Sequence, residues 1–205
     1  MKKGLIQIAL GILIVVMFYL LVESIAKPIR FKKEQTHRYN VVIQNLKDIR
    51  TAQMAYKDVY GEFTGSFDTL EHFVKHDSLP LVFKKGEIPE ELLGQISERE
   101  AIEKGMIIRD TIRVNVMDSI FPDNYRIDSL RFIPFTGGKE FTMKAGEVVT
   151  GSKLKVKVFE AKAPSKYILR GLDEQLIINM NDGLEYPGLK VGSLTEANNA
   201  AGNWE

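Results

Sequence analysis

The clearest pair of residues that could do chemistry together is His72 and His76, in the stretch LEHFVKHD. A spacing of four places both imidazoles on one face of a helix, near Glu71 and Asp77, and such a set could hold a metal ion. The stretch lacks the internal glutamate of the zinc peptidase motif, because it reads His-Phe-Val-Lys-His. We therefore interpret the pair as exposed histidines flanking a core Phe73, with an anchored metal-dependent hydrolase as the alternative.

The other candidates for chemistry fail on spacing or on residue type. The stretch NMNDGLEYPG around Gly183 brings oxygen ligands together but not with the spacing of an EF-hand, so we interpret it as a turn. Asp110 and Asp118 have no pattern that would make them converge. The absence of cysteine excludes thiolate nucleophiles, disulfides and cysteine-based metal sites. We expect no catalytic residue, no metal and no cofactor.

Composition predicts a folded chain without a strong charge bias. The 205 residues are 44% hydrophobic and 27% charged, with a formal net charge of +1. A balance of this kind does not favour nucleic acid as a partner. The length allows one domain of roughly 140 residues and a stalk beside an apolar segment.

The N-terminal segment is apolar over a length that suits a membrane. From Leu5 to Val22 there is no charged residue, and the run extends to Ala26. About 20 helical residues span the roughly 30 Å hydrocarbon layer. A secretory signal has a shorter apolar region and a small-residue cleavage site, which this run lacks. We expect residues 1–26 to be an uncleaved transmembrane anchor in a bacterial inner membrane.

Basic residues on the two sides of this run predict opposite orientations. Lys2 and Lys3 precede it, whereas a larger group follows it and would keep the head in the cytoplasm by the positive-inside rule. This group consists of Lys27, Arg30, Lys32, Lys33 and Arg38. A short lysine-led tail before a single apolar segment is, however, typical of a bacterial signal anchor.

A stalk helix is expected over residues 27–62. Pro28 predicts a kink or a restart near its beginning, and Gly61 predicts its end. A seam of steps of three and four, interrupted by Gln53, predicts either packing against the chain's own sheet or contact with another helix, including self-association through the stalk. The seam residues are Tyr39, Val42, Leu46, Ile49, Gln53, Tyr56 and Tyr60.

The end of the stalk carries a family resemblance. The stretch LKDIRTAQMAYKDVYGEFTGSFDTLEHFV resembles the junction between spine and globule of type IV pilins and type II secretion pseudopilins. The matching residues are Thr51, Ala52, Gln53, Tyr56, Tyr60, Gly61, Phe63, Ser66, Phe67, Asp68 and Leu70. The resemblance implies an anchored helix continuous with a head on the periplasmic side. Cleavage after Gly4, as in pilins, would place Ala9 where those families carry a glutamate.

Residues 63–205 are expected to form an α+β head, mainly an antiparallel sheet of four to six strands with one or two helices. Pro89 and Gly105 bracket a helical pattern. Five segments with strand-like composition lie between turn signals: 106–117, 129–135, 140–149, 153–161 and 174–180. The polar segment 188–205 is predicted to be a flexible tail, whose lone Trp204 could dock on a partner.

Together these patterns predict a single-pass, membrane-anchored, non-catalytic subunit or scaffold of an envelope assembly of the secretion or translocation type. Its expected partners are the lipid bilayer and other membrane or envelope proteins. A pilin-like filament subunit is the alternative within the non-enzyme class. The residues predicted to bind partners are Tyr39, Val42, Leu46, Ile49, Gln53, Tyr56, Tyr60 and Trp204.

Overall fold

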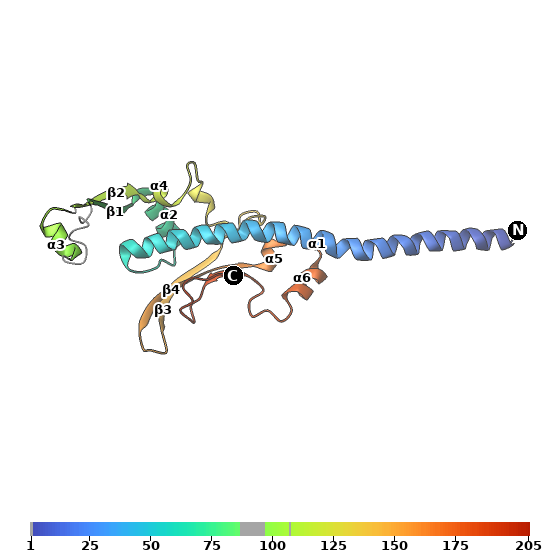
Figure 1. The fold of residues 1–205 in the computed structure, drawn as a ribbon. Helices are drawn as coiled ribbons and strands as arrows, with labels where there is room; N and C mark the ends of the chain where they lie inside the picture. Colours follow the sequence, from blue (N-terminus) through green and yellow to red (C-terminus); the bar gives the residue numbers. More distant parts are fainter. Residues whose placement is uncertain (1, 87–96, 107) are drawn as a thin grey trace.

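The computed structural model describes residues 2–86, 97–106 and 108–205, and it has the α+β architecture that the sequence predicts (Figure 1). One long helix runs from the N-terminal end of the described molecule through its head (Figure 1). A three-stranded sheet lies along its C-terminal half, and a two-stranded ribbon extends past its end. The N-terminal half of the helix projects free of the head.

The helical elements alternate with five strands. The helices are α1 (Lys2–Tyr60), α2 (Phe67–His76), α3 (Glu98–Glu103), α4 (Val116–Ile120), the 3₁₀ turn η2 (Ile127–Ser129), α5 (Ser165–Ile168) and α6 (Glu174–Asn181). The strands are β1 (Ser78–Lys85), β2 (Ile108–Asn115), β3 (Thr142–Val149), β4 (Lys155–Pro164) and β5 (Gly188–Gly192).

Helix α1 is a single element of 59 residues. At about 1.5 Å per residue it is about 88 Å long. Pro28 lies inside it and does not interrupt it, so the restart expected at the membrane exit does not occur. The end is as predicted: Gly61 has a φ of 76°, and its N–H donates to the Lys57 carbonyl over 2.8 Å. Anchor and stalk are therefore one helix.

The main sheet is antiparallel with the order β3-β4-β5. On β4, Phe159, Ala161 and Ala163 are buried and alternate along the strand. The small side chains of the two alanines let α1 approach the sheet closely, and Val42 and Leu46 of α1 are fully buried. The C-terminal half of α1 thus forms the central element of the head's core.

Helix α2 covers a further side of α1. Its N-cap is Ser66, whose hydroxyl accepts from the Thr69 N–H. Its buried face consists of Phe67, Leu70, Phe73 and Val74. The Phe73 ring stands edge-on to Tyr56 of α1, with the centroids 5.2 Å apart. The sequence Ser-Phe-Asp that follows the end of α1 therefore begins a short helix, which Ser66 caps and which buries one apolar face.

The strand predictions are partly confirmed. Segments 106–117 and 140–149 contain β2 and β3, and segment 153–161 covers all of β4 except its last three residues. Segment 129–135 instead contains the end of η2 and one isolated bridge, from Phe132 to Glu140. Segment 174–180 was expected to be a strand and is helix α6, because Asp173 caps it by accepting from the Leu176 N–H over 2.9 Å. An apolar run this short does not by itself show whether its residues repeat with the period of a helix or with that of a strand.

The predicted helix between Pro89 and Gly105 is described only in its second half. Residues 97–106 contain α3, whose Ser97 and Glu100 form a reciprocal capping box. Gly105 follows with a φ of 70°, as expected after a helix end. The part from residue 87 to residue 96 lies outside the described residues.

The prediction of a flexible tail over 188–205 is wrong, because this segment is integrated into the head. It begins with β5, which pairs with β4. Farther along, the Asn203 N–H donates to the Lys190 carbonyl and the Lys190 N–H donates to Asn203 Oδ1, each over 3.0 Å. Arg50 of α1 binds Glu205 with an N–O distance of 2.7 Å. Glycine-rich flanks concealed the short strand, whose Leu189 and Val191 are buried.

Gln53 fixes the exit of the chain from α1. It is fully buried, its Nε2 donates to the Thr64 carbonyl over 2.6 Å, and its Oε1 accepts from the Thr64 N–H over 3.1 Å. We predict that Gln53→Leu lowers the free energy of unfolding by about 2 kcal/mol, because both backbone groups of Thr64 lose their partner. Denaturant unfolding followed by circular dichroism measures this.

Gln44→Leu is the matched control, since Gln44 is exposed and bonds only to Asp48, one turn away. It should change stability by less than about 0.5 kcal/mol. Equal stabilities of the two variants would contradict the stabilising role assigned to the hydrogen bonds between Gln53 and Thr64.

Candidate binding surfaces

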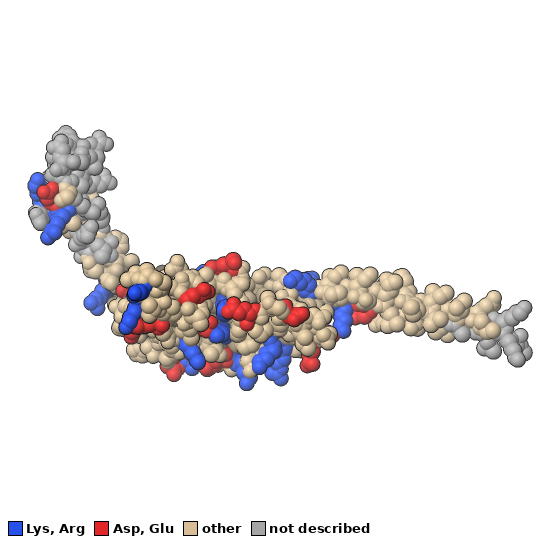
Figure 2. Space-filling model, turned by 90° about the horizontal axis from the view of Figure 1, so that it is seen from below, with Lys and Arg blue, Asp and Glu red and all other residues tan. Residues whose placement is uncertain are grey.

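The free half of α1 is the largest uncovered apolar surface of the described residues. Its side chains are exposed all round the helix, and none of its most apolar 18-residue window is buried. This helix is long and apolar enough to cross a membrane, and it begins near the N-terminus. Figure 2 shows that most charged side chains of the described residues gather on the head. At the junction of the head with the free half, Glu23 pairs with Arg30, and Lys27 pairs with Asp173.

The seam predicted to bind partners lies mostly inside the head. Its four central residues are fully buried and have no surface to offer another helix: Val42, Leu46, Ile49 and Gln53. The sequence allowed packing against the chain's own sheet or contact with another helix. In the structure, the chain's own head covers the seam. Sequence periodicity identifies a buried stripe without identifying what covers it.

The aromatic ends of the seam differ in their environments. The Tyr39 hydroxyl shares a hydrogen bond of 2.7 Å with Ser165, and burial raises the pKa of this tyrosine. Tyr56 is half-buried, and its ring lies 4.7 Å from that of Tyr60. Tyr60 is exposed and donates to Asp77 over 2.5 Å. Only Tyr60 at the end of the seam presents a large free surface.

Trp204 docks on its own chain. Its ring packs against the core of the head, beside Tyr39 and Ile43 of α1. Its Nε1 is buried without a hydrogen-bond partner among the described residues. Trp204 thus occupies a groove of its own chain, and its docking on a partner stays a prediction.

The histidine pair does not assemble a metal site in the described structure. His72 and His76 are exposed, with their rings 4.8 Å apart. The two acids that could join them are engaged elsewhere: Glu71 accepts from Arg131 over 2.8 Å and Asp77 accepts from Tyr60. No group of three or more metal-binding side chains occurs in the described part of the chain.

The β1–β2 ribbon is an apolar surface that sequence reasoning missed. Leu81 pairs with Ile112 across the ribbon, and Phe83 and Ile108 lie on the same face by register. These four side chains are 40–58% exposed. The ribbon extends from the end of the head opposite to the free half of α1 (Figure 1). The signal was the alternation of apolar residues in SLPLVF, which Pro80 obscured because proline is confined to edge strands.

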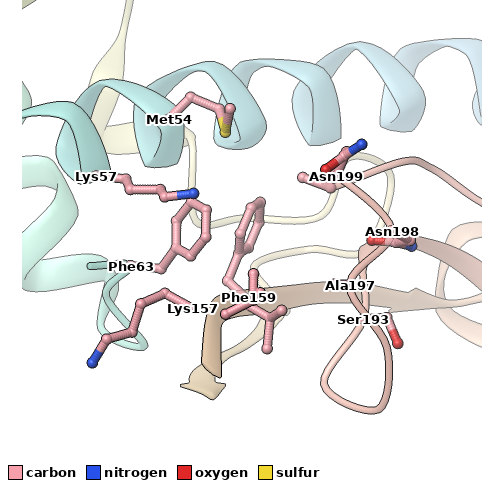
Figure 3. A pocket seen from close by; sticks show the side chains of 12 residues that line it. Met54, Lys57, Phe63, Lys157, Phe159, Ser193, Ala197, Asn198 and Asn199 are labelled. Carbon is pink, nitrogen blue, oxygen red and sulfur yellow. The ribbon is translucent and has the colours of Figure 1, made fainter. Parts of the chain in front are cut away.

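A pocket of about 180 Å³ opens between the end of α1, strand β4 and the C-terminal segment (Figure 3). Phe63 and Phe159 form its floor, with ring centroids 4.8 Å apart. Apolar cavities of about 150 Å³ accept one benzene ring. The pocket therefore has room for one aromatic or branched aliphatic side chain.

Two lysines line the pocket in different ways. Lys157 forms ion pairs with Glu147 and Glu62, at 2.5 and 3.7 Å, and the bond with Glu147 raises the pKa of its ammonium group. It points away from the rings in Figure 3. The Lys57 ammonium lies 5.0 Å from the centroid of Phe63, and no carboxylate of the described residues pairs with it. The pocket thus combines an apolar floor with one uncompensated positive charge.

The wall that the C-terminal segment forms contains a strained turn next to α1. Asn199 and Ala200 have φ values of 53° and 57°, in the left-handed region that side chains other than glycine rarely adopt. Arg50 of α1 holds this turn by donating to the Ala200 carbonyl over 3.3 Å. Such strain occurs often at binding sites, where the surrounding structure enforces it.

Comparison with family models, with curated proteins and with solved structures finds no match for this chain.

We predict that N-acetylphenylalanine binds this pocket more tightly than its uncharged amide, because Lys57 attracts the carboxylate. The methyl signal of Met54, which lines the pocket, reports binding in protein labelled with ¹³C at the methionine methyl groups. Lys57→Gln should weaken binding of the acid about twofold to fivefold and leave binding of the amide unchanged.

Lys157→Gln is the matched control, since Lys157 is already paired, and it should preserve the preference. Equal binding of acid and amide to the wild type would contradict the role given to Lys57.

Proposed function

We propose that this protein is a single-pass, membrane-anchored, non-catalytic subunit or scaffold of a bacterial envelope assembly of the secretion or translocation type. The observation that supports it most is α1, in which an uncovered apolar half and the core of a folded head belong to one unbroken helix. An architecture of this kind holds a binding domain at a fixed place on a membrane.

We infer that lipid surrounds the free half of α1. Large apolar side chains are exposed in every direction around it, so packing against one flat surface would leave most of them in water. In a bilayer the backbone polar groups are satisfied within the helix, and each Leu, Ile, Phe or Val near the centre contributes favourably to insertion. Residues 6–26 supply the roughly 20 residues required.

We place the head on the periplasmic side of the inner membrane. The resemblance of residues 51–70 to pilin and pseudopilin junctions supports this side, since the heads of those proteins face away from the cytoplasm. The basic group around Arg30 and Lys33 supports the opposite side by charge counting. The cytoplasmic orientation is therefore the alternative that a topology measurement must distinguish.

Because the chain's own head covers most of the seam, we propose two other surfaces for partners. The ribbon presents Leu81, Phe83, Ile108 and Ile112 at the end of the head away from the membrane. The pocket beside Lys57 accepts one apolar side chain and favours a neighbouring carboxylate. Contiguous exposed apolar side chains typically mark interaction sites.

A pilin-like filament subunit is the second candidate, favoured by the single spine helix with a free apolar half. Ala9, in place of the glutamate of pilins, argues against assembly of that type. We predict that the protein from its native membranes retains Lys2 and Lys3, as measured by mass spectrometry of its N-terminal peptide. An N-terminus at Leu5 would instead support pilin-type processing and the filament.

The direct test of the scaffold role is purification of the tagged protein from its native membranes in a mild detergent. We predict stoichiometric recovery of other membrane proteins, and loss of at least one of them from the variant Phe83→Ser, Ile108→Ser. Both side chains are about half exposed and distant from the core, so the head should stay folded.

Thr111→Ser, on the opposite face of the ribbon by register, is the matched control and should retain every partner. Recovery of the chain alone, or only with copies of itself, would overturn the scaffold proposal.

A further inference from the structure

The pocket beside Lys57 is also lined by backbone donors that the described chain does not use. Asn198, Asn199 and Ala200 form the part of its wall that belongs to the C-terminal segment. The N–H groups of Asn199 and Ala200 have no hydrogen-bond acceptor in the described part of the chain. Ala200 is only 8% exposed. The backbone N–H of a buried residue normally has a partner, so this turn suits a ligand that brings an acceptor of its own.

The conformation of this turn is one that binds anions. Asn199 and Ala200 are successive residues in the left-handed region, with φ values of 53° and 57°. Consecutive backbone N–H groups of turns form concavities that bind anions, including the carboxyl termini of peptides. Arg50 of α1 keeps the turn in place through the Ala200 carbonyl. Donors that are already held in place cost less ordering when a ligand binds.

Lys57 adds a positive charge across the two aromatic rings from this turn (Figure 3). Its ammonium group lies 5.0 Å from the centroid of the Phe63 ring. The acids Glu62 and Glu147 gather around Lys157, which points away from the rings. A charged group above the rings therefore meets the Lys57 ammonium and the N–H groups of the turn, and both favour an anion.

The size of the pocket restricts where this anion can be on a polypeptide. Its volume of about 180 Å³ has room for one aromatic or branched aliphatic side chain. In an extended segment, the side chains before and after that residue point to the opposite side, so an acid at either place is directed away from the pocket. An α-carboxylate is attached to the same Cα as the side chain in the pocket, and it is ionised at neutral pH. A chain terminus therefore fits better than an internal acidic segment.

We propose that the pocket beside Lys57 binds the carboxyl terminus of a partner polypeptide whose last residue is aromatic or branched aliphatic. The side chain of that residue lies on Phe63 and Phe159, and its carboxylate binds the Lys57 ammonium and the N–H groups of the Asn199 turn. This inference rests on the partner-binding role proposed above and identifies the part of a partner that the pocket takes. A polypeptide has one carboxyl terminus, so the contact also fixes which end of the partner meets the head.

Three acetylated peptides that differ in one feature each test this inference on the full chain in phosphatidylcholine nanodiscs. The first is acetyl-Gly-Ala-Phe with a free carboxylate. The second is acetyl-Gly-Ala-Phe-Asp amide, which has the same net charge but an internal phenylalanine. The third is acetyl-Gly-Ala-Gly with a free carboxylate, which lacks the large side chain.

Methyl signals of ¹³C-labelled methionine report where each peptide binds. Met54 lines the pocket, and its signal is identified by its loss in Met54→Leu. Met17 lies in the free half of α1, so its signal reports any peptide that enters the lipid.

We expect acetyl-Gly-Ala-Phe to shift the Met54 signal and to bind at least about fivefold more tightly than either other peptide, because hydrogen bonds to a charged group are strong. Lys57→Gln should reduce this preference, and Lys157→Gln should preserve it. Equal binding of the internal-phenylalanine peptide would overturn recognition of a terminus, as would equal binding of the glycine peptide or a shift of Met17 alone. None of these results changes the co-purification of other membrane proteins, which tests the scaffold role itself.

Discussion

The structure depends on the fact that an α-helix satisfies its backbone hydrogen bonds internally, so its side chains alone determine what must cover it. Along α1 this requirement changes once. The first half is apolar on every side and the second half only along a stripe. One element therefore connects a segment that is long and apolar enough to cross a membrane to the core of the folded head without a joint.

The head is arranged around the stripe. Val42, Leu46 and Ile49 are fully buried beneath the sheet and α2, and the alanines of β4 permit the close approach. Gln53 is the polar exception, and its amide satisfies both backbone groups of Thr64 where the chain turns back. The C-terminal segment closes the arrangement through Arg50, which holds both Ala200 and Glu205. The C-terminal half of α1 is thus covered on several sides, and the exposed apolar surfaces of the described head lie at its periphery.

The sequence predicted the features that a strong period or a special residue determines. The long apolar run, the end of α1 at Gly61 and the strands β2, β3 and β4 belong to this group. The restart at Pro28 did not occur, because a proline inside a long helix removes a single backbone bond that the remaining turns can outweigh. Segment 174–180 was misread because its apolar run is too short to show a period. The two neighbours that complete the ribbon and the sheet, β1 and β5, were missed because Pro80 and the glycines around β5 hid their alternation.

The candidate binding surfaces were the least predictable part. A buried stripe and a partner-binding stripe have the same periodicity, so Leu46 and Ile49 could be identified as apolar contacts but not assigned to a partner. The pocket at Lys57 combines residues from α1, β4 and the segment around Asn199, which only the tertiary fold brings together. The placement of α6 beside Lys27 likewise follows from an ion pair between residues far apart in the chain.

The rigid connection between the two halves of α1 depends on the continuity of the helix across Pro28, which one distance between two labelled residues tests directly. Spin labels at Leu20→Cys and Gln44→Cys, both exposed positions, are separated by 24 residues of helix. In nanodiscs, double electron–electron resonance should give a single narrow distribution centred at about 36 Å, with allowance for the length of the labels. A broad distribution, or one centred several ångströms shorter, would show that the helix bends or breaks at the membrane exit, and would contradict the rigid connection between the anchor and the head.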